Sequence, residues 1–448
     1  MSTNLKMRSV NLDKTYKNKS SWHLATLLMK KYLDTQSKAS IIFDFATKSL
    51  SKIQLKATKS LFYGALRNLY RIDYTVNALV KKKPKNLILS IFFITGYQLI
   101  DDKNTKYAKI IHNAVENSKL LVSKEEIKFI NALLRKIAVM FDEQSPEKSY
   151  SIYYSHPQWL IDRWINQFGR INTKYLLQWN QEDSKTYLLS KNPLTALDNE
   201  VNSLIDNYAV SLDENSALKK IYPISGETLN NQYIRNLLKA GEAYIKDPST
   251  LHAVNFLDPK PGETLLDLCA SPGGKSFDCL SRMKDRGIFV AVDFGEKKIK
   301  RLKDNIKSFH NKKLSVTCLD YDIKKLSEKY LLSNNCPSLY DAILIDVPCS
   351  NTGVIQRKPD IRYRLSRNDF ELIAQTQLQL LKSGSQFLKV NGRLVYSTCS
   401  IDYKENREVI NMFLESAEGK CYYLESSKCY YPWANNHDGA GVFLLRKR

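Results

Sequence analysis

Residues 263–276, ETLLDLCASPGGKS, restrict the possible folds of this chain more than any other stretch. Residues 264–268 have the length and apolarity of a buried strand, and Pro272-Gly273-Gly274 forms a turn after them. Glycine lets backbone N–H groups approach a ligand because it has no Cβ, and a helix that begins near Lys275 adds the positive end of its dipole. The stretch therefore predicts a strand that leads into a ligand-binding loop.

The next strand indicates which ligand this loop binds. A phosphate-binding P-loop requires a glycine five residues before Gly274, and that position holds Cys269, so a phosphate or a nucleoside triphosphate is disfavoured. A second apolar run, residues 288–292, ends in Asp293. An acid about twenty residues past the glycine turn binds a ribose in Rossmann-type sites. The pattern therefore favours a ligand that contains a nucleoside.

Length and charge suggest several domains and a polyanionic partner. A chain of 448 residues is too long for one core and suits two or three domains. Its formal net charge is +22, and residues 1–150 contain 27 basic and 12 acidic side chains, or +15, which leaves +7 for the rest. This excess predicts that the N-terminal third binds nucleic acid. The alternative is an A/T-rich genome that enriches lysine without any binding role.

Residues 20–145 have helical periodicity almost throughout. Apolar residues recur every three or four positions in two segments, which contain Phe62, Leu66, Leu69, Ile72, Val76 and Leu79, and Ile127, Ile130, Leu134, Ile137 and Phe141. The longest apolar run, residues 87–100, is too short to span a bilayer, so we expect a buried helix there. The polar, lysine-rich N-terminus has no secretory signal pattern, which predicts a cytoplasmic protein without a membrane partner.

Four segments of this region resemble the NusB-like RNA-binding domain. They are FYGALRNLYRIDYTVNAL (62–79), ITGYQLI (94–100), HNAVENSK (112–119) and FINALLRK (129–136). The resemblance implies that residues 1–145 form an all-α domain that binds RNA.

The remaining chain is expected to contain two further parts. A polar stretch, residues 142–150, predicts a linker, and residues 146–250 mix strand-like and helical pieces, which predicts a small α+β linking module. Residues 251–448 alternate strands and helices, which predicts an α/β domain with an open, mostly parallel, doubly wound Rossmann-like sheet. The expected strands lie near 264–268, 288–293, 314–319, 341–346 and 393–397, and the expected helices near 295–308, 368–388 and 404–415.

The eight cysteines all lie in the C-terminal half and form no CxxC pair. This spacing argues against a zinc site and against a disulfide framework, so we expect no metal and a reducing compartment. Cys349 and Cys399 each follow an apolar strand within four residues, and Asp346 stands beside the first of them. A buried structural role is the alternative for each cysteine alone. Two thiols in equivalent loops favour chemistry at the carboxyl ends of the strands.

Three segments resemble the RNA cytosine-C5 methyltransferases of the NOL1/NOP2/Sun family. They are LDLCASPGGK (266–275), ILIDVPCSNTGVIQRKPDIRYR (343–364) and VYSTCSIDYKENREVI (395–410). The resemblance implies a class I methyltransferase domain, S-adenosylmethionine as the methyl donor and 5-methylcytosine in small-subunit (16S) ribosomal RNA as the product. We expect a monomer.

The chemistry of that family explains the two thiols and the acid. Carbon 5 of cytosine is too electron-poor to attack a methyl sulfonium, so a thiolate must first add to carbon 6. The resemblance implies that Cys399 is this nucleophile and that Cys349 takes part in release of the product. Asp346 is expected to hydrogen-bond the pyrimidine near N3 and could also contact the cofactor.

The resemblance also implies a binding site for the donor. Asp293 is expected on the ribose and Asp320 on the adenine amino group, although Asp322 could take that role and an ordinary solvated loop residue is the alternative for each acid. The implied cofactor-binding residues are Cys269, Ala270, Ser271, Pro272, Gly273, Gly274, Lys275, Asp293, Asp320 and Asp346. Ser271 replaces the alanine that is usual in the family, and Ser190-Lys191 replaces its arginine and valine.

A basic cluster follows the Pro-Cys-Ser segment, and it could neutralise RNA phosphates or could be a solvated loop. Its members are Arg357, Lys358, Arg362 and Arg364. Two alternatives to the implied function stay open: an RNA-binding ribosome-assembly factor without catalysis, and a cytosine-C5 methyltransferase that acts on another RNA such as tRNA.

Overall fold

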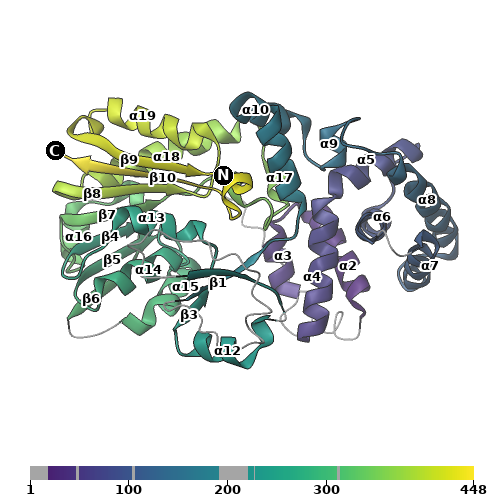
Figure 1. Ribbon diagram of the computed structural model, residues 1–448, viewed down its shortest axis with the longest axis horizontal. Coiled ribbons are helices and arrows are strands. Elements are labelled where there is room, and N and C mark those ends of the chain that lie inside the picture. Colours follow the sequence, from purple (N-terminus) through teal and green to yellow (C-terminus); the bar gives the residue numbers. More distant parts are fainter. Residues whose placement is uncertain (1–18, 47–49, 103–105, 191–219, 227, 310–312) are drawn as a thin grey trace. The chain divides into compact units, whose positions relative to one another are not determined.

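The computed structural model describes residues 19–46, 50–102, 106–190, 220–226, 228–309 and 313–448 (Figure 1). The chain forms two compact units. Unit 1 comprises Met1–Glu182 and Ile355–Leu365, and unit 2 comprises Asp183–Val354 and Ser366–Arg448. The chain thus leaves unit 2 for a short segment of unit 1 and then returns. The predicted three-part division, with boundaries after residues 145 and 250, stays a prediction.

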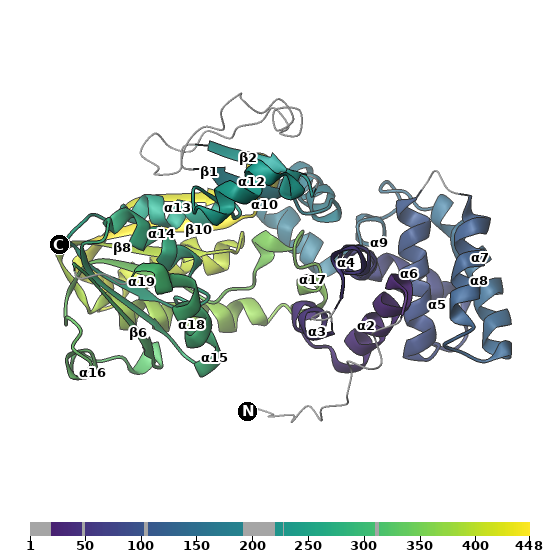
Figure 2. The ribbon, with the colours of Figure 1, turned by 90° about the horizontal axis from the view of Figure 1, so that it is seen from below.

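Unit 1 is helical, as the periodicity predicted. Serine side chains begin several of its helices: Ser20, Ser51 and Ser123 each accept a hydrogen bond from a first-turn backbone N–H, and Ser123 forms a capping box with Glu126. Helices α5 to α8 contact one another in sequence and pack as a group (Figure 2). The described helices are α2 (Ser21–Thr35), α3 (Ala39–Ala46), α4 (Lys52–Arg67), α5 (Leu69–Leu79), α6 (Asn86–Asp101), α7 (Tyr107–Ser118), α8 (Lys124–Asp142), α9 (Tyr150–Tyr153), α10 (Gln158–Gln181) and α17 (Ile361–Arg364).

The apolar faces of helices α2 to α8 form one core. The predicted core residues Phe62, Leu66, Ile72 and Val76 are fully buried in it, and α6 contributes most of its length. This burial confirms that residues 87–100 form an internal helix. Among the described residues, no helix has the length and apolarity needed to cross a bilayer.

The segment Ile355–Leu365 is anchored in unit 1 by a buried arginine. The side chain of Arg362 is 0 % exposed, and its guanidinium donates hydrogen bonds to carbonyl oxygens. Those oxygens belong to Arg67, Tyr154, Ser155 and Asn180. The expectation that Arg362 could neutralise RNA phosphates is therefore wrong, because a guanidinium without solvent exposure satisfies backbone groups of its own unit.

Unit 2 contains the predicted sheet. Its strand order is β6-β5-β4-β7-β8-β10-β9, and β6 to β8 in this order pair in parallel, whereas β10 runs antiparallel to both of its neighbours. The order places the glycine turn after β4, the middle one of the five parallel strands. The strands are β4 (Thr264–Leu268), β5 (Gly287–Asp293), β6 (Leu314–Asp320), β7 (Tyr340–Asp346), β8 (Leu388–Thr398), β9 (Tyr422–Tyr430) and β10 (Ala440–Lys447).

Alternate strand residues enter two different cores, one on each face of the sheet. Leu265 and Leu344 pack with α13 (Ser249–Leu257), α14 (Gly274–Met283) and α15 (Glu296–Ile306). On the other face, Leu266 and Ile345 pack with three other helices, because successive side chains of a strand point to opposite faces. These are α16 (Glu328–Ser333), α18 (Asp369–Ser385) and α19 (Arg407–Glu415). The doubly wound, Rossmann-like fold is confirmed.

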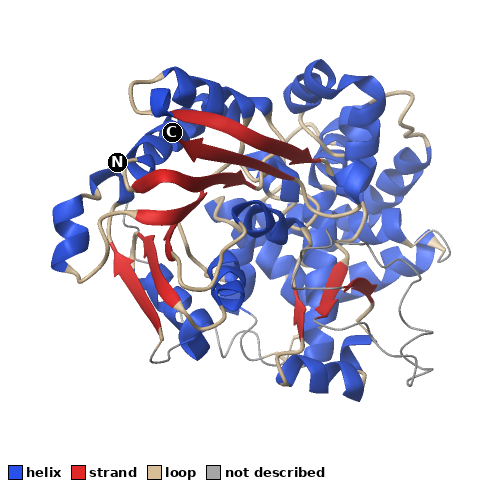
Figure 3. Cartoon of the chain, turned by 60° about the vertical axis from the view of Figure 1, so that its left-hand side comes forward, coloured by secondary structure: helices blue, strands red, loops and turns tan. Residues whose placement is uncertain are grey.

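A second, smaller sheet precedes the large one in unit 2 (Figure 3). Its antiparallel order is β2-β1-β3, with β1 at Thr186–Ser190, β2 at Lys220–Ile224 and β3 at Ala243–Ile245. Helix α12 (Gln232–Lys239) packs against it. These three strands and α12 agree with the mixture of strand-like and helical pieces expected over residues 146–250. Lys191, one of the three residues that depart from the family pattern, lies outside the described residues.

Candidate active site

The glycine turn after β4 has the conformation that its sequence predicted. Gly273 is the N-cap of α14 with φ of 102°, and a Cβ there would lie 3.0 Å from Cδ1 of Leu302. A residue other than glycine would be strained in this backbone conformation and crowded by α15. Within the turn, the N–H of Gly273 donates to the carbonyl of Ala270 at 2.8 Å. The first N–H groups of α14 are consequently held at the end of the central strand.

Asp267 lies in β4 directly before this turn and is buried, with 1 % of its surface exposed. Its Oδ2 accepts a hydrogen bond of 2.5 Å from Ser276 Oγ, whereas Oδ1 has no hydrogen-bond partner among the described residues. Burial raises the pKa of Asp267 to about 7; the Ser276 hydrogen bond lowers it and the charge of Asp346 raises it further. A buried carboxylate oxygen without a partner beside a glycine turn is available to a ligand that binds there.

Asp293 and Asp320 end neighbouring strands and pair with each other in the β5–β6 register. Asp293 is buried, and its carboxylate accepts hydrogen bonds from Ser271 N at 3.0 Å and from Lys298 Nζ at 2.8 Å. Asp320 is more exposed, and its Oδ1 accepts from Gly295 N at 2.7 Å. Both acids therefore lie at the carboxyl edge where the sequence placed them. Asp322 instead caps a 3₁₀ turn, accepting from Lys324 N.

The two cysteines predicted from the sequence lie next to each other. Sγ of Cys349, in the loop after β7, is 3.1 Å from Sγ of Cys399, in the loop after β8. Asn351 connects both loops: its Nδ2 donates to the carbonyl of Cys349 at 2.7 Å, and its Oδ1 lies 3.3 Å from Sγ of Cys399. Both cysteines are of intermediate exposure as whole residues.

Asp346 connects the thiol loops to the glycine turn. Its Oδ2 accepts a hydrogen bond of 2.7 Å from the ammonium of Lys275, in the first turn of α14. Its Oδ1 accepts from Ser397 Oγ, at the end of β8, also at 2.7 Å. The glycine turn, the acid and the segment that precedes Cys399 thus form one continuous site at the carboxyl ends of β4, β7 and β8.

The charges in this site distinguish the two thiols. Hydrogen bonding to Cys399 is the largest cause that raises the pKa of Cys349 well above its usual value, followed by burial and by the charges of Cys399 and Glu405. Burial alone would lower the pKa of Lys275, but the charge and hydrogen bond of Asp346 and the charge of Cys399 raise it. Lys275 is therefore an ammonium, and its charge interacts with those of Asp346 and Cys399.

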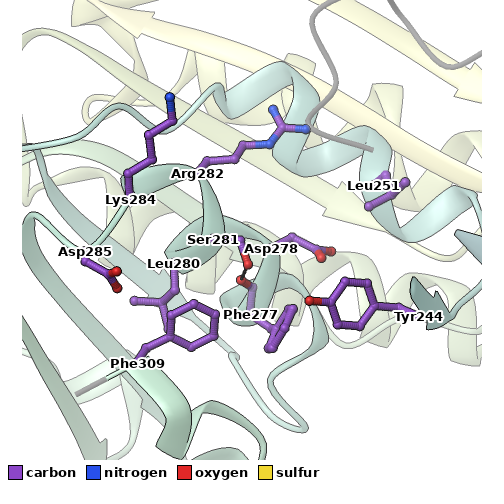
Figure 4. A pocket seen from close by; sticks show the side chains of 10 residues that line it. All are labelled: Tyr244, Leu251, Phe277, Asp278, Leu280, Ser281, Arg282, Lys284, Asp285 and Phe309. Atoms are coloured by element: carbon purple, nitrogen blue, oxygen red, sulfur yellow. Dashed lines mark hydrogen bonds between the residues drawn. The ribbon is translucent and has the colours of Figure 1, made fainter. Parts of the chain in front are cut away.

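A separate hollow of about 330 Å³ lies along the C-terminal half of α14 (Figure 4). Aromatic side chains form part of its wall, and Phe277 contacts Tyr244 and Phe309 edge to face. Its buried acid, Asp278, is already paired with Lys246 at 2.7 Å. None of its lining residues belongs to the predicted site, so we do not assign the chemistry to this hollow.

The predicted site residues of the turn and the strand ends share one edge of the sheet, and Lys275, Asp346, Cys349 and Cys399 form the connected part of it. Sequence reasoning missed the role of Asn351, although it stands two residues after Cys349. Its left-handed backbone, with φ of 62°, is typical of asparagine in a tight turn. Among the described residues, no group of three or more histidine, cysteine or acidic side chains could hold a metal ion.

Comparison with known proteins identifies the family. The model of the 16S rRNA methyltransferase RsmB/F family matches residues 254–429, and the NusB family model matches residues 12–139. A protein of Bacillus subtilis (strain 168) named "Probable ribosomal RNA small subunit methyltransferase B" is 30% identical over 79% of this chain and 78% of its own length. This chain belongs to the RsmB/F family of 16S rRNA methyltransferases. The resemblance to methyltransferases and to NusB is thereby confirmed.

Other members of the RsmB/F family align over nearly the whole chain. The ribosomal RNA small subunit methyltransferase B of Proteus mirabilis (strain HI4320) is 28% identical over 96% of this chain and 100% of its own length. Among solved structures, that of PH0851 is 22% identical with a TM-score of 0.70 over 96% of this chain and 99% of that chain. NSun6 from Pyrococcus horikoshii with SFG has a TM-score of 0.52 and 16% identity over 65% of this chain and 98% of that chain. These structures support the fold of this RsmB/F-family chain.

Proposed function

We propose that this chain is an S-adenosylmethionine-dependent RNA methyltransferase that methylates carbon 5 of a cytosine in small-subunit (16S) ribosomal RNA. The observation that supports this most directly is the pair of thiols, 3.1 Å apart, beside Asp346. Membership of the RsmB/F family supports the RNA substrate, and the NusB match supports RNA binding by residues 12–139. The cytosine target rests on the chemistry of the thiols.

The residues at the carboxyl edge fit S-adenosylmethionine. The unpartnered Oδ1 of Asp267 and the first N–H groups of α14 are proposed to bind polar groups of the cofactor, and Asp293 ends β5 where a ribose is expected. Asp320 is the candidate for the adenine amino group. When bound, S-adenosylmethionine supplies the methyl group. The proposed cofactor-binding residues are Cys269, Ala270, Ser271, Pro272, Gly273, Gly274, Lys275, Asp293, Asp320 and Asp346.

The nucleophile in this proposal is Cys399. Its thiolate, close to the positive charge of Lys275, adds to carbon 6 of the cytosine and raises the electron density on carbon 5. Asp346 is positioned by Lys275 and Ser397 to hydrogen-bond the pyrimidine edge as the ring is attacked. The target base has to leave its stack to reach these groups.

Cys349 is proposed to act in the release step. In this proposal Cys399 is the thiolate, and its hydrogen bond with Cys349 is the main cause that raises the pKa of Cys349 before the reaction. Once the Cys399 sulfur is bonded to carbon 6, that negative charge is gone and Cys349 can lose its proton to solvent. The Cys349 thiolate then takes the proton from carbon 5, the electron pair re-forms the 5,6 double bond, and the bond between carbon 6 and Cys399 breaks.

Methyl transfer from labelled S-adenosylmethionine to unmodified 16S ribosomal RNA tests the proposal. We expect label in 5-methylcytosine after nuclease digestion, detected by mass spectrometry. tRNA and large-subunit RNA serve as competing substrates, and label confined to tRNA would contradict the 16S target. No incorporation into any RNA, together with salt-sensitive RNA binding, would instead support a non-catalytic assembly factor.

A further inference from the structure

A buried carboxylate lies between the loops of the two thiols. Glu405 is 0 % exposed and lies in the 3₁₀ turn Tyr403–Glu405, six residues after Cys399. Each cysteine is followed directly by a serine, and both serines donate to this one carboxylate. The backbone N–H of Ser350 donates to Oε2 and the hydroxyl of Ser400 donates to Oε1, each at 2.7 Å. One side chain therefore holds both loops.

The same carboxylate is also connected to helix α18. Nε2 of Gln377 donates to Oε2 of Glu405 at 3.2 Å and to the carbonyl of Pro348 at 3.0 Å. The main chain of Glu405 is fixed as well, because its carbonyl accepts a hydrogen bond of 2.6 Å from the hydroxyl of Tyr396 in β8. Two of the donors to the carboxylate are N–H groups that can only donate, so the geometry accommodates the ionised form.

Direct contacts between the loops complete the connection. The hydroxyls of Ser350 and Ser400 are 3.2 Å apart, and Thr352 Oγ1 is 3.0 Å from Ser400 Oγ. The N–H of Gly353 donates to the carbonyl of Cys399 at 3.0 Å, and a Cβ at Gly353 would lie 2.8 Å from that oxygen. The loops approach so closely that a shift of one loop must displace the other.

We propose that Glu405 is a positioning residue that clamps the loop of Cys349 to the loop of Cys399 and thereby sets the distance and the different roles of the two sulfur atoms. This inference deepens the proposed function and rests on it. The clamp acts on the thiols through Ser350 and Ser400, the residues that follow them in the chain.

The charge of Glu405 gives the clamp a second effect. Burial raises the pKa of Glu405, and the hydrogen bonds from Ser350 and Ser400 oppose that rise. The negative charge in turn contributes to the raised pKa of Cys349, after the contribution of Cys399 and of burial. A Cys349 that holds its proton more tightly is, once deprotonated, a stronger base for the proton on carbon 5.

The test compares three variants of the full-length chain: Glu405→Gln, Glu405→Ala and the matched control Glu408→Gln. Glutamine keeps the shape of the side chain, and its oxygen can still accept hydrogen bonds from Ser350 and Gln377. The hydroxyl of Ser400 can turn to accept a hydrogen bond from the new amide. This variant therefore keeps the clamp and removes the charge. Alanine removes both the hydrogen bonds of the clamp and the negative charge. Glu408, in α19, is partly exposed and pairs with Lys404, and among the described residues it makes no hydrogen bond with either cysteine or the serine after it.

The readouts are thiol measurements that need no RNA, together with kcat and KM. Oxidised glutathione converts the two adjacent thiols to a disulfide and is itself reduced to two molecules of glutathione, so the rate of this crosslink reports their separation. We expect Glu405→Ala to slow the crosslink at least about 10-fold and to lower kcat more than KM, and Glu405→Gln to keep a near-normal crosslink rate. In Glu405→Gln, the midpoint pH for alkylation of Cys349 by iodoacetamide should fall by about one unit. Alkylation is measured on the peptide that contains Cys349.

Either of two results would overturn the inference. One is a crosslink rate in Glu405→Ala equal to that of Glu408→Gln; the other is an unchanged alkylation profile of Cys349 in Glu405→Gln. If Glu405→Ala does not fold, the pH dependence of Cys349 alkylation in Glu405→Gln still tests the inference. A chain that shows the thiol effects but transfers no methyl group to RNA would contradict the proposed function and leave the clamp supported.

Discussion

The sulfur atoms of Cys349 and Cys399 lie 3.1 Å apart, although 50 residues separate them in the chain. They meet because β7 and β8 are parallel neighbours whose carboxyl ends share one edge of the sheet. At this distance, two thiols cannot both be ionised without strong repulsion, so they titrate as a coupled pair. One sulfur is therefore available as a nucleophile while the other keeps a proton.

Replacement of Cys399 by alanine should abolish methyl transfer. The thiolate that adds to carbon 6 is then missing, and the loss of a nucleophile lowers kcat by about 10³-fold or more. The measurement is label transferred from S-adenosylmethionine to RNA. Cys421→Ala, an exposed cysteine in a different part of unit 2, should behave like the parent chain. Comparable transfer by Cys399→Ala would assign the nucleophile to another residue.

Replacement of Cys349 by alanine should trap the reaction after methyl transfer. The bond between Cys399 and carbon 6 then forms but breaks slowly, so a covalent complex of protein and RNA accumulates. A denaturing gel detects it as a band of reduced mobility that nuclease removes. The double variant Cys349→Ala/Cys399→Ala should give no such band. Normal turnover of Cys349→Ala without an adduct would show that the two roles are assigned wrongly.

Replacement of Arg362 by methionine should destabilise unit 1. The change leaves four buried carbonyl oxygens without the guanidinium that now donates to them. The carbonyls of Arg67, Tyr154 and Ser155 keep other side-chain donors, so we expect the lost charged hydrogen bonds to cost at least about 2 kcal/mol in total. Urea unfolding followed by circular dichroism measures it.

The matched control for Arg362 is Arg364→Met. Arg364 is part of the same short helix, but its side chain is partly exposed and pairs with Asp360 at 3.1 Å. Asp360 is buried but keeps a hydrogen bond from the N–H of Ala39, so we expect loss of this half-exposed pair to cost about 1 kcal/mol. Equal stability of the two variants would contradict the structural role of Arg362.

Replacement of Asp267 by asparagine should change how stability depends on pH. Burial raises the pKa of Asp267 from 3.8 to about 7 in the folded chain. Below about pH 4 the carboxyl is protonated in both states and has no effect; as the pH rises to 7, only the unfolded chain ionises, which favours unfolding. The penalty reaches on the order of 4 kcal/mol at most and then stays constant.

Asparagine does not ionise, and its side-chain oxygen can still accept the hydrogen bond from Ser276. The stability of Asp267→Asn relative to the parent should therefore increase between pH 4 and 7. Thermal unfolding at several pH values measures the difference. Asp304→Asn, at an exposed position of α15, is the control. A constant difference between Asp267→Asn and the parent across this range would contradict the raised pKa.

The sequence predicted those parts of the fold whose patterns are local. The expected strands at 264–268, 288–293 and 341–346 match β4, β5 and β7 closely, because buried parallel strands are short, continuous apolar runs. Strands β9 and β10 were missed. Their pairing is antiparallel at one side of the sheet, and β9 is largely exposed, so its residues carry no apolar run.

Site residues could be predicted where a motif marks them, and not where their role depends on contacts distant in the chain. Cys349, Cys399 and Asp346 stand at strand ends, and their motifs let the sequence predict that they lie at one edge of the sheet. Arg362 has the charge of a phosphate contact, and only its burial among carbonyls shows otherwise. Glu405 stands among other charged residues of a turn, and its contacts with Ser350 and Gln377 follow from the sheet, not from local spacing.

The segment Ile355–Leu365 belongs to unit 1 but lies in the chain between two parts of unit 2. Unit 1 therefore cannot be exchanged for another domain as one continuous piece of sequence. A gene fusion that replaced only residues 1–182 would leave Arg362 without the four backbone oxygens that it binds. The domain that replaced residues 1–182 would also have to pack against residues 355–365, eleven residues that the gene encodes far downstream. The two halves of this polypeptide are therefore expected to have been inherited together, with insertions tolerated only outside that short span.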